Sequence, residues 1–240
     1  MKTIKIIGAL AISLVLSSCN FDSIIGQVHG NGNVETEERM VSENFSEVKG
    51  SAGLDVYLTE GSENKIIVEA DENLLDIIET NIDNGRLNIT TQKNIGRSKS
   101  KKVHVTYKKL DEIYASSGAD VIGNSVVKSE RIILDASSGS DIEVEVFAKE
   151  VIVDTSSGAD IHVTGKATLL MASSSSGSEI NAKELTVINC NADASSGANI
   201  IVNVKEKLST EATSGGNIRY YGNPTAVSND ASRSGNVRKM

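Results

Sequence analysis

Apolar and polar residues alternate along most of the second half of the chain. Around each copy of the phrase Ser-Ser-Gly-Ala-Asp, one parity holds aliphatic or small residues, as at Ile132, Leu134 and Ala136. The other parity holds polar and acidic residues. Strict alternation is the side-chain period of a β-strand with one buried face. The pattern therefore predicts strands throughout this half of the chain.

The phrase recurs at a nearly constant interval. Its acidic or amide position advances by 18 to 21 residues at each step, through Asp120, Asp141, Asp160, Glu179, Asn199, Asn217 and Asn236. A period of this length indicates repeated units that stack on one another. A single unit cannot bury its own apolar face, so its neighbours must cover it. The sequence thus predicts an all-β fold, a single-chain β-solenoid (β-helix) of about 20-residue coils.

Each coil has large aliphatic residues on both sides of a group of small ones. In the coil around Ser156, Val151 and Val153 precede the phrase. Ile161 and Val163 follow it, and small residues lie between. We therefore expect a flattened coil whose two aliphatic walls meet at a narrow edge. We also expect the second serine of the phrase to point inward and the glycine to provide the bend, because glycine adopts positive φ at little cost.

The other segments divide the chain into three parts. Residues 1–18 contain two lysines, an apolar run and the ending Leu-Ser-Ser before Cys19, a pattern typical of a bacterial lipoprotein signal peptide. Residues 19–41 are polar and aperiodic, so we expect a flexible tether. Residues 42–240 form the predicted β-solenoid domain. Within it, residues 42–110 are irregular first coils and a hairpin that cap the stack, and residues 111–240 are regular repeats.

Lipidation of Cys19 would anchor the mature chain in a membrane, because several acyl chains together hold a protein stably. The expected location is the cell envelope, as an outer-membrane lipoprotein on either the periplasmic or the surface face. The net charge of −8 argues against nucleic acid as a partner, since phosphate contacts need clustered Lys and Arg. The expected partners are the membrane, through the lipid, and a protein or glycan ligand. The sequence leaves the oligomeric state open.

Candidate catalytic residues are few. His29, His104 and His162 are far apart in the sequence and lack a paired ligand spacing. The serine pair repeats in coils with no differentiated neighbours, whereas a catalytic serine occurs once, so we expect its hydroxyls to hydrogen-bond from coil to coil. Cys190 falls at an inward aliphatic position, as expected for a small buried side chain. The pattern favours a non-enzymatic protein with no catalytic residue and no cofactor.

One ladder of carboxylates could bind a ligand. Its members should stack along one outer edge of the solenoid, where like charges at strand spacing repel one another: Asp120, Asp141, Asp160 and Glu179. A bound Ca²⁺ would relieve this repulsion, so a weak cation site is one interpretation. Solvated or turn-capping side chains are the other, which we favour because the column changes to asparagine after Glu179.

The chain resembles the bacterial family described as "putative auto-transporter adhesin, head GIN domain". The likeness covers residues 42 to about 225 and rests on the repeat Ser-Ser-Gly-[Ala/Ser]-[Asp/Asn]-[Ile/Val], on the lead-in from Phe45 to Tyr57, and on the segments 72–75 and 85–89. The resemblance implies a β-solenoid envelope lipoprotein that acts as an adhesin or binding module. A polysaccharide-active enzyme on a β-helix and a purely structural or oligomerising envelope rod are the alternatives.

Overall fold

The computed structural model describes residues 26–231 and 234–240. These residues form one coiled sheet with a single short 3-10 helix, η1, so the predicted all-β class is confirmed. In chain order the elements are β1 (Val34–Arg39), β2 (Glu47–Gly50), β3 (Asp55–Glu60), β4 (Lys65–Asp71), η1 (Glu72–Ile77), β5 (Ile78–Asp83), β6 (Arg86–Thr91), β7 (Lys101–Tyr107), β8 (Glu112–Ser116), β9 (Asp120–Gly123), β10 (Val127–Ser137), β11 (Asp141–Ser156), β12 (Asp160–Ser174), β13 (Glu179–Ala194), β14 (Asn199–Ala212), β15 (Asn217–Tyr221), β16 (Ala226–Ala231) and β17 (Asn236–Lys239).

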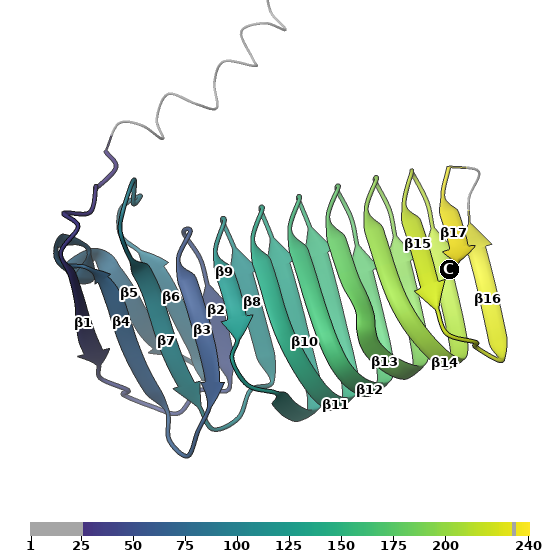
Figure 1. Cartoon of the computed structure of the whole chain (residues 1–240), viewed down its shortest axis with the longest axis horizontal. Coiled ribbons are helices and arrows are strands. Elements are labelled where there is room, and N and C mark those ends of the chain that lie inside the picture. Colours follow the sequence, from purple (N-terminus) through teal and green to yellow (C-terminus); the bar gives the residue numbers. More distant parts are fainter. Residues whose placement is uncertain (1–25, 232–233) are drawn as a thin grey trace, which may run out of the picture.

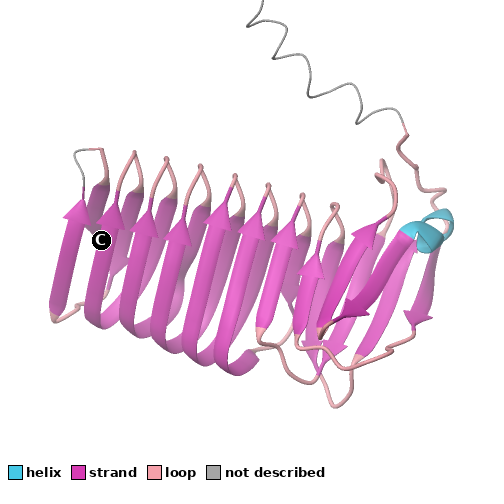
Figure 2. Cartoon of the chain, turned by 180° about the vertical axis from the view of Figure 1, so that it is seen from behind, coloured by secondary structure: helices cyan, strands magenta, loops and turns pink. Residues whose placement is uncertain are grey.

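The sheet folds into two facing walls that run the length of the molecule (Figure 1). Wall A consists, in spatial order, of β5, β6, β2, β8, β10, the second halves of β11 to β14, and β16. Wall B consists of β1, β4, β7, β3, β9, the first halves of β11 to β14, β15 and β17. Each long strand therefore passes through both walls and bends where they join, and tight turns connect the walls at the opposite edge (Figure 2).

Successive coils are parallel and in register. Asp141 pairs with Asp160, and Asp160 pairs with Glu179, so a coil in this part is 19 residues long. Ile161 lies between Ile142 and Ile180 in the same way. Neighbouring strands lie about 4.8 Å apart, so each side chain contacts its equivalent in the coils above and below. The predicted stacking of near-20-residue coils is confirmed.

The repeated phrase forms the tight turn between the walls. In the coil around Ser156, Ser157 and Gly158 have φ of 55° and 70°, and the Ala159 N–H donates to the Ser156 carbonyl at 3.2 Å. Two left-handed residues inside a hydrogen-bonded turn are characteristic of type I′. The expectation that the second serine points inward and that glycine alone provides the bend is therefore wrong. The two left-handed residues interrupt the strand alternation, and the second serine is exposed.

Backbone bonds link each turn to the next. The Gly158 N–H donates to the Ser176 carbonyl of the following coil at 3.2 Å, and Gly177 donates to the Ser196 carbonyl at 3.1 Å. The second serine thus contributes a backbone acceptor to the ladder. A left-handed residue other than glycine costs roughly 1–2 kcal/mol, and these inter-coil bonds offset part of that cost. The turns form a continuous ridge along one edge of the solenoid (Figure 1).

The core lies between the walls and narrows toward the ridge. Ile142, Ile161 and Ile180 are buried from wall B, and Val153 and Leu170 are buried from wall A. Burying one such side chain contributes roughly 1.5–3 kcal/mol. The walls meet beneath the ridge at small buried residues: Ala159, Ala172, Ala192 and Ala198.

Buried hydroxyls occupy the narrow edge in several coils, and three of them, on Thr155, Ser174 and Ser178, bond to one another. The Thr155 hydroxyl donates to Ser174 at 2.8 Å, and the Ser178 hydroxyl donates to Thr155 at 3.0 Å. Ser178 Oγ also lies 2.9 Å from Ser174 Oγ. Hydroxyls do bond between coils, as expected, but these residues flank the repeated serine pair and are not its members. Mutual bonding satisfies groups that would otherwise be costly to bury.

The N-terminal end departs from the sequence prediction. Residues 19–41 were expected to be a tether, but β1 pairs with β4, and the segment before it is also bonded to the domain. The Val28 N–H donates to the Asn94 carbonyl at 2.9 Å, and the Gly30 N–H donates to the Arg97 carbonyl at 2.8 Å. The described residues from about 28 onward therefore belong to the domain. Residues 1–18, the expected signal peptide, and Cys19 lie outside the described residues.

Asp71 holds this end together. Its buried carboxylate accepts backbone N–H bonds from Gly32 at 2.8 Å, Lys99 at 3.0 Å and Ser100 at 2.9 Å. Desolvation opposes ionisation, but these donors and the charge of Lys99 outweigh it, so the pKa of Asp71 lies below its ordinary value. Gly30 must be glycine because a Cβ there would overlap the Asp71 carboxylate. The helix η1 buries Leu74 and Leu75 and closes the core at this end.

A charge in the core should unfold the stack. Ile161 is 1% exposed, so Ile161→Asp would place an unpaired carboxylate between two apolar walls. We expect loss of the cooperative thermal transition, because burying an unpaired charge costs several kcal/mol and the lost aliphatic burial about 1.5–3 kcal/mol more, a large part of the roughly 5–15 kcal/mol that stabilises a typical domain. The matched control is the neighbouring outward residue, and Asp160→Asn should leave the protein folded. Circular dichroism during heating measures both, and equal tolerance of the two changes would contradict the assignment of inner and outer faces.

Candidate functional site

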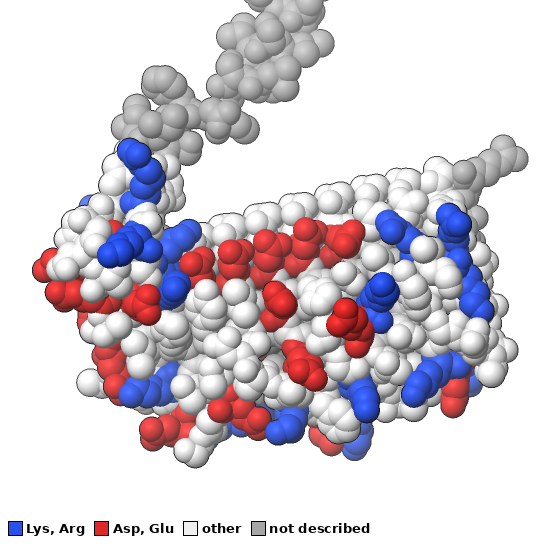
Figure 3. Space-filling model, in the orientation of Figure 1, with Lys and Arg blue, Asp and Glu red and all other residues white. Residues whose placement is uncertain are grey.

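A row of carboxylates lies on wall B directly beneath the ridge (Figure 3). The wall B acid row, as we call it, consists of side chains that pair in register on consecutive strands: Asp55, Asp120, Asp141, Asp160 and Glu179. The ladder predicted from the sequence is thus assembled by the structure and is extended by Asp55. Lys101 and Lys102 flank its N-terminal end, and Asn199 follows Glu179 at the other end.

Crowding raises the pKa of two members of this row. For Asp141, desolvation is the main cause, and the charges of Asp120 and Asp160 add to it. For Asp55, desolvation again dominates, Lys101 opposes it, and Asp120 reinforces it. The row borders a groove of about 360 Å³ that also includes Ile122, Glu143 and His162. These carboxylates would therefore gain stability from a nearby positive charge.

The arrangement of the row does not by itself make a metal centre. In the described part of the chain, no three His, Cys, Asp or Glu side chains come together in a way that could hold a metal ion. Carboxylates at strand spacing form a line, whereas Ca²⁺ requires six to eight oxygens around one point. The weak Ca²⁺ interpretation of Asp120, Asp141, Asp160 and Glu179 stays an untested expectation.

A second acidic surface lies on the other side of the ridge, on wall A. It is a groove of about 460 Å³, which we call the wall A groove. Carboxylates line it in one register column, interrupted by Ser173: Asp135, Asp154, Asp193 and Glu211. Hydroxyls line it in a parallel column next to the ridge: Ser156, Ser175, Ser195 and Thr213. The groove thus presents acceptors and donors that repeat from coil to coil along the solenoid.

The electrostatics of the wall A groove resemble those of the wall B acid row. Desolvation raises the pKa of Asp135, and the charge of Asp154 adds to this while Lys49 opposes it. Desolvation also raises the pKa of Asp154, although a hydrogen bond from Ser173 opposes the change. The column continues toward the N-terminus through Tyr114 and Lys49. A cationic ligand would relieve the repulsion and would meet hydroxyl partners beside it.

The sequence analysis did not predict this groove. The signal was present as the pattern Asp-x-Ser, in which the acidic residue and the first serine of the phrase share a parity, as in Asp154 and Ser156. The missing information was depth, because the distance between two columns and the height of the ridge depend on how the walls twist and pack. A sequence pattern predicts which side chains share a face of the sheet, but it does not predict whether that face is hollowed into a groove.

The three histidines and Cys190, which the sequence analysis also considered, are packed against or bonded to neighbouring residues, and they do not form a common site. His104 stacks on Tyr57 with ring centroids 5.4 Å apart, and the His29 Nδ1 accepts the Arg97 N–H at 3.2 Å. Burial, together with the charge of Asp193, raises the pKa of Cys190 to about 12, so its thiol is protonated at neutral pH. His162 lies half-buried beside the wall B acid row. None of the helices in the described part is long and apolar enough to span a membrane.

Removing one charge from the centre of the wall B acid row should stabilise the protein. Asp141 lies between Asp120 and Asp160, so Asp141→Asn should raise the free energy of unfolding at pH 7 by roughly 0.2–1 kcal/mol. The gain should shrink in salt, because exposed charges are screened. Since the folded-state pKa of Asp141 is raised, the wild-type protein gains stability as pH falls through that pKa toward 3.8, and the variant's advantage should disappear there.

Thermal melts between pH 3.5 and 7 measure this effect. Glu145→Gln on the same strand is the matched control, because it removes an exposed charge that pairs with Thr164 and not with a carboxylate. An equal gain from both substitutions would show that net charge, and not stacking of the row, is responsible.

The chain is similar in sequence to a known protein family and in fold to several solved structures. The family model "putative auto-transporter adhesin, head GIN domain" matches residues 44–224. A crystal structure of a putative adhesin from Bacteroides fragilis superposes with a TM-score of 0.82 at 17% identity, covering 89% of this chain and 100% of the other. A putative lipid binding protein from Parabacteroides distasonis gives 0.72 at 21% identity, covering 89% and 99%.

A third solved structure, of a putative adhesin from Parabacteroides merdae, has a TM-score of 0.65 and 22% identity and covers 90% of this chain and 99% of the other. At these identities the three structures demonstrate a shared fold. No curated protein matches the chain in sequence. The family model spans most of the chain and includes every coil of the regular repeat up to β15. The chain is therefore a member of the head GIN domain family of putative auto-transporter adhesins.

Proposed function

We propose that this protein is a non-enzymatic, lipid-anchored binding module of the cell envelope and that it recognises a cationic ligand through the wall A groove. The adhesin-type family indicates a surface or envelope location and a role without catalysis. The proposal includes a lipid on Cys19, attachment to the outer membrane and the cationic ligand. The observation that carries the proposal is the groove itself, with carboxylates and hydroxyls repeated on successive coils.

The chemistry of the groove favours a basic ligand. Asp135 and Asp154 already have raised pKa values, in both cases mainly because they are desolvated, and for Asp135 also because the charge of Asp154 is close. An ammonium or guanidinium group placed between them would favour their charged forms and form charge-assisted hydrogen bonds. Since the columns repeat at about 4.8 Å, an extended ligand with several positive charges could contact several coils. A basic segment of a partner protein fits this description.

The groove argues against the enzyme alternative. The pKa values of Asp135 and Asp154 are both raised, and desolvation is the main cause for each, whereas general acid–base catalysis relies on two groups whose environments separate their pKa values. Release of reducing ends from acidic polysaccharides, abolished by a single aspartate substitution, would favour the enzyme. A purely structural rod predicts instead that neither peptide nor glycan binds.

Binding should depend on the wall A groove and not on net charge. We expect the full chain to bind a fluorescent oligolysine peptide, and Asp154→Asn combined with Asp193→Asn to weaken it about tenfold, or 1.4 kcal/mol. The matched control is Asp141→Asn combined with Asp160→Asn, which removes the same charge from wall B and should change affinity less than about twofold. Fluorescence anisotropy measures both. Equal losses in the two double variants would contradict groove-specific recognition, and tighter binding of a neutral chitin oligomer would indicate a glycan ligand.

Anchoring through Cys19 has a separate test. Cells that express the full chain and are fed an alkyne fatty acid should label the wild-type protein, because lipidation attaches acyl chains to this residue. Cys19→Ala should lose the label. Cys190→Ala should keep it, because that thiol is buried in the core. Undiminished labelling of Cys19→Ala would contradict the lipoprotein assignment without affecting the groove proposal.

A further inference from the structure

We infer that copies of this chain associate end to end, with the C-terminal edge of one copy docked on the N-terminal edge of the next. The inference is independent of the groove proposal. It rests on the strands that terminate the two walls. In the described part of the chain, β1 and β5 each have a strand partner on one side only at the N-terminal end, and β16 and β17 do so at the C-terminal end (Figure 1). Their free backbone groups can accept another strand.

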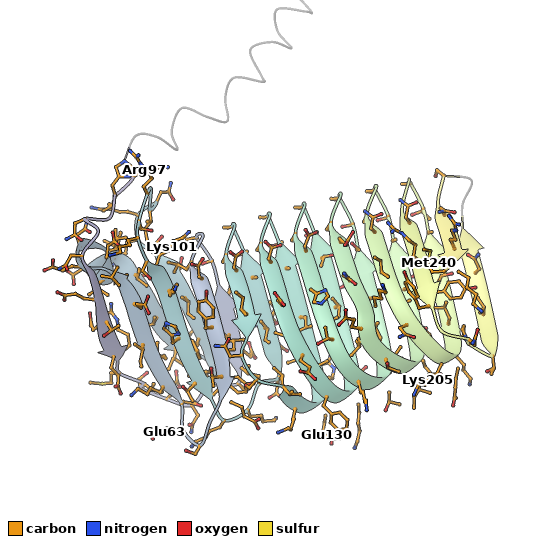
Figure 4. The ribbon with its side chains drawn as sticks, in the orientation of Figure 1. Glu63, Arg97, Lys101, Glu130, Lys205 and Met240 are labelled. Atoms are coloured by element: carbon orange, nitrogen blue, oxygen red, sulfur yellow. The ribbon has the colours of Figure 1, made fainter. Side chains whose placement is uncertain are left out.

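Apolar exposure is concentrated at the two ends. The described residues include four large hydrophobic side chains that are exposed, and three of them lie at the ends: Met40 beside β1 at 89%, Val227 in β16 at 47% and Met240 after β17 at 52%. Val227 pairs with Leu208, which is only 2% exposed. The two residues occupy the same inward column, so Val227 is exposed because no further coil covers it. Figure 4 shows Met240 on the last coil.

The strand directions suit head-to-tail contact. β1 is antiparallel to β4, and β4 is antiparallel to β7, so β1 runs in the same direction as β7. β7 is parallel to β3, and every later pairing in wall B is parallel as far as β17. A second copy stacked by translation along the axis would therefore add β1 to β17 as one more parallel strand. The helix η1 closes the core at the N-terminal end, so the contact is made by strand edges.

The charges on the edge strands favour contact between the N-terminal end of one copy and the C-terminal end of another. The two edge strands that would meet carry opposite net charge, because β1 contains three glutamates and one arginine and β17 contains one arginine and one lysine. The ladder of wall B places Thr36 in the same column as Asn236, so a translated copy would bring Glu38 beside Arg238, and both side chains are exposed. Within its own copy Glu38 also contacts Lys65 at 2.8 Å. Lys239 would lie beside Arg39, which Glu37 contacts at 3.1 Å. Head-to-tail stacking thus brings an acidic strand against a basic one, whereas contact between identical ends would oppose like charges.

Head-to-tail contact does not close on itself. An interface between two different surfaces of the same chain generates an open series unless the rotation forms a ring, so the expected product is a ladder of multimers and not a discrete dimer. If each copy is also anchored at its N-terminus, the stack must lie along the membrane.

Cysteine cross-linking in intact cells tests the inference on the full chain. Thr36 on β1 and Asn236 on β17 are exposed and uncharged, so Thr36→Cys and Asn236→Cys report on the two edges without removing a charge. A long-armed bismaleimide should produce a ladder of covalent multimers only when both cysteines are in one chain. The unsubstituted chain should give none. Dimers from Asn236→Cys alone would indicate tail-to-tail contact and would overturn the inference, as would the absence of any product from the double variant.

A charge swap in the doubly cysteine-substituted chain distinguishes a specific contact from chance proximity. Arg238→Glu should reduce multimers at least about tenfold, the effect of losing about 1.4 kcal/mol. Adding Glu38→Arg should restore them to within about twofold. Loss without restoration would contradict the proposed pairing, provided that both variants keep the wild-type melting transition.

Discussion

The parallel ladder between successive 19-residue coils is the constraint on which the rest of this structure depends. Apart from the bulges that β12, β13 and β14 contain, the register is in phase and side chains lie against their own equivalents: Ile161 lies between Ile142 and Ile180, and Asp160 lies between Asp141 and Glu179. Columns of aliphatic residues gain from this arrangement and columns of carboxylates lose. The repulsion in the acid rows is therefore a direct consequence of the order that buries the core.

The ridge of turns is the other consequence of that ladder. In each copy of the repeated phrase two consecutive residues adopt left-handed backbone conformations, as Ser157 and Gly158 do. The chain therefore reverses direction within a tight turn. The small residues beneath the turns allow the two walls to meet, so the carboxylates of the wall A groove and those of the wall B acid row lie on opposite sides of the ridge and only a few residues apart in sequence. A surface with carboxylates on both sides of a narrow ridge follows from repeating one short phrase.

Function is less constrained than fold. Proteins of 17–22% identity share this architecture, and one of them is described as lipid binding while others are described as adhesins. The alternation of apolar and polar residues specifies stacked coils without specifying the outward residues, so recognition can change on a constant scaffold. In this chain the outward residues form a hydroxyl and carboxylate groove in the middle of the solenoid and oppositely charged edge strands at its ends.

The sequence alone determined the coil period, the inner and outer faces, and the ladder from Asp120 to Glu179, because a two-residue alternation and a fixed repeat are local properties that stacking preserves. Only the tertiary structure decided the rest. It joined residues 28–30 to residues 94–97 through long-range backbone bonds and brought the N–H groups of Gly32 and Lys99 to the Asp71 carboxylate. It also turned the second serine outward and gave the wall A groove its depth. These features depend on segments distant in sequence and on how the walls pack, which no local pattern encodes.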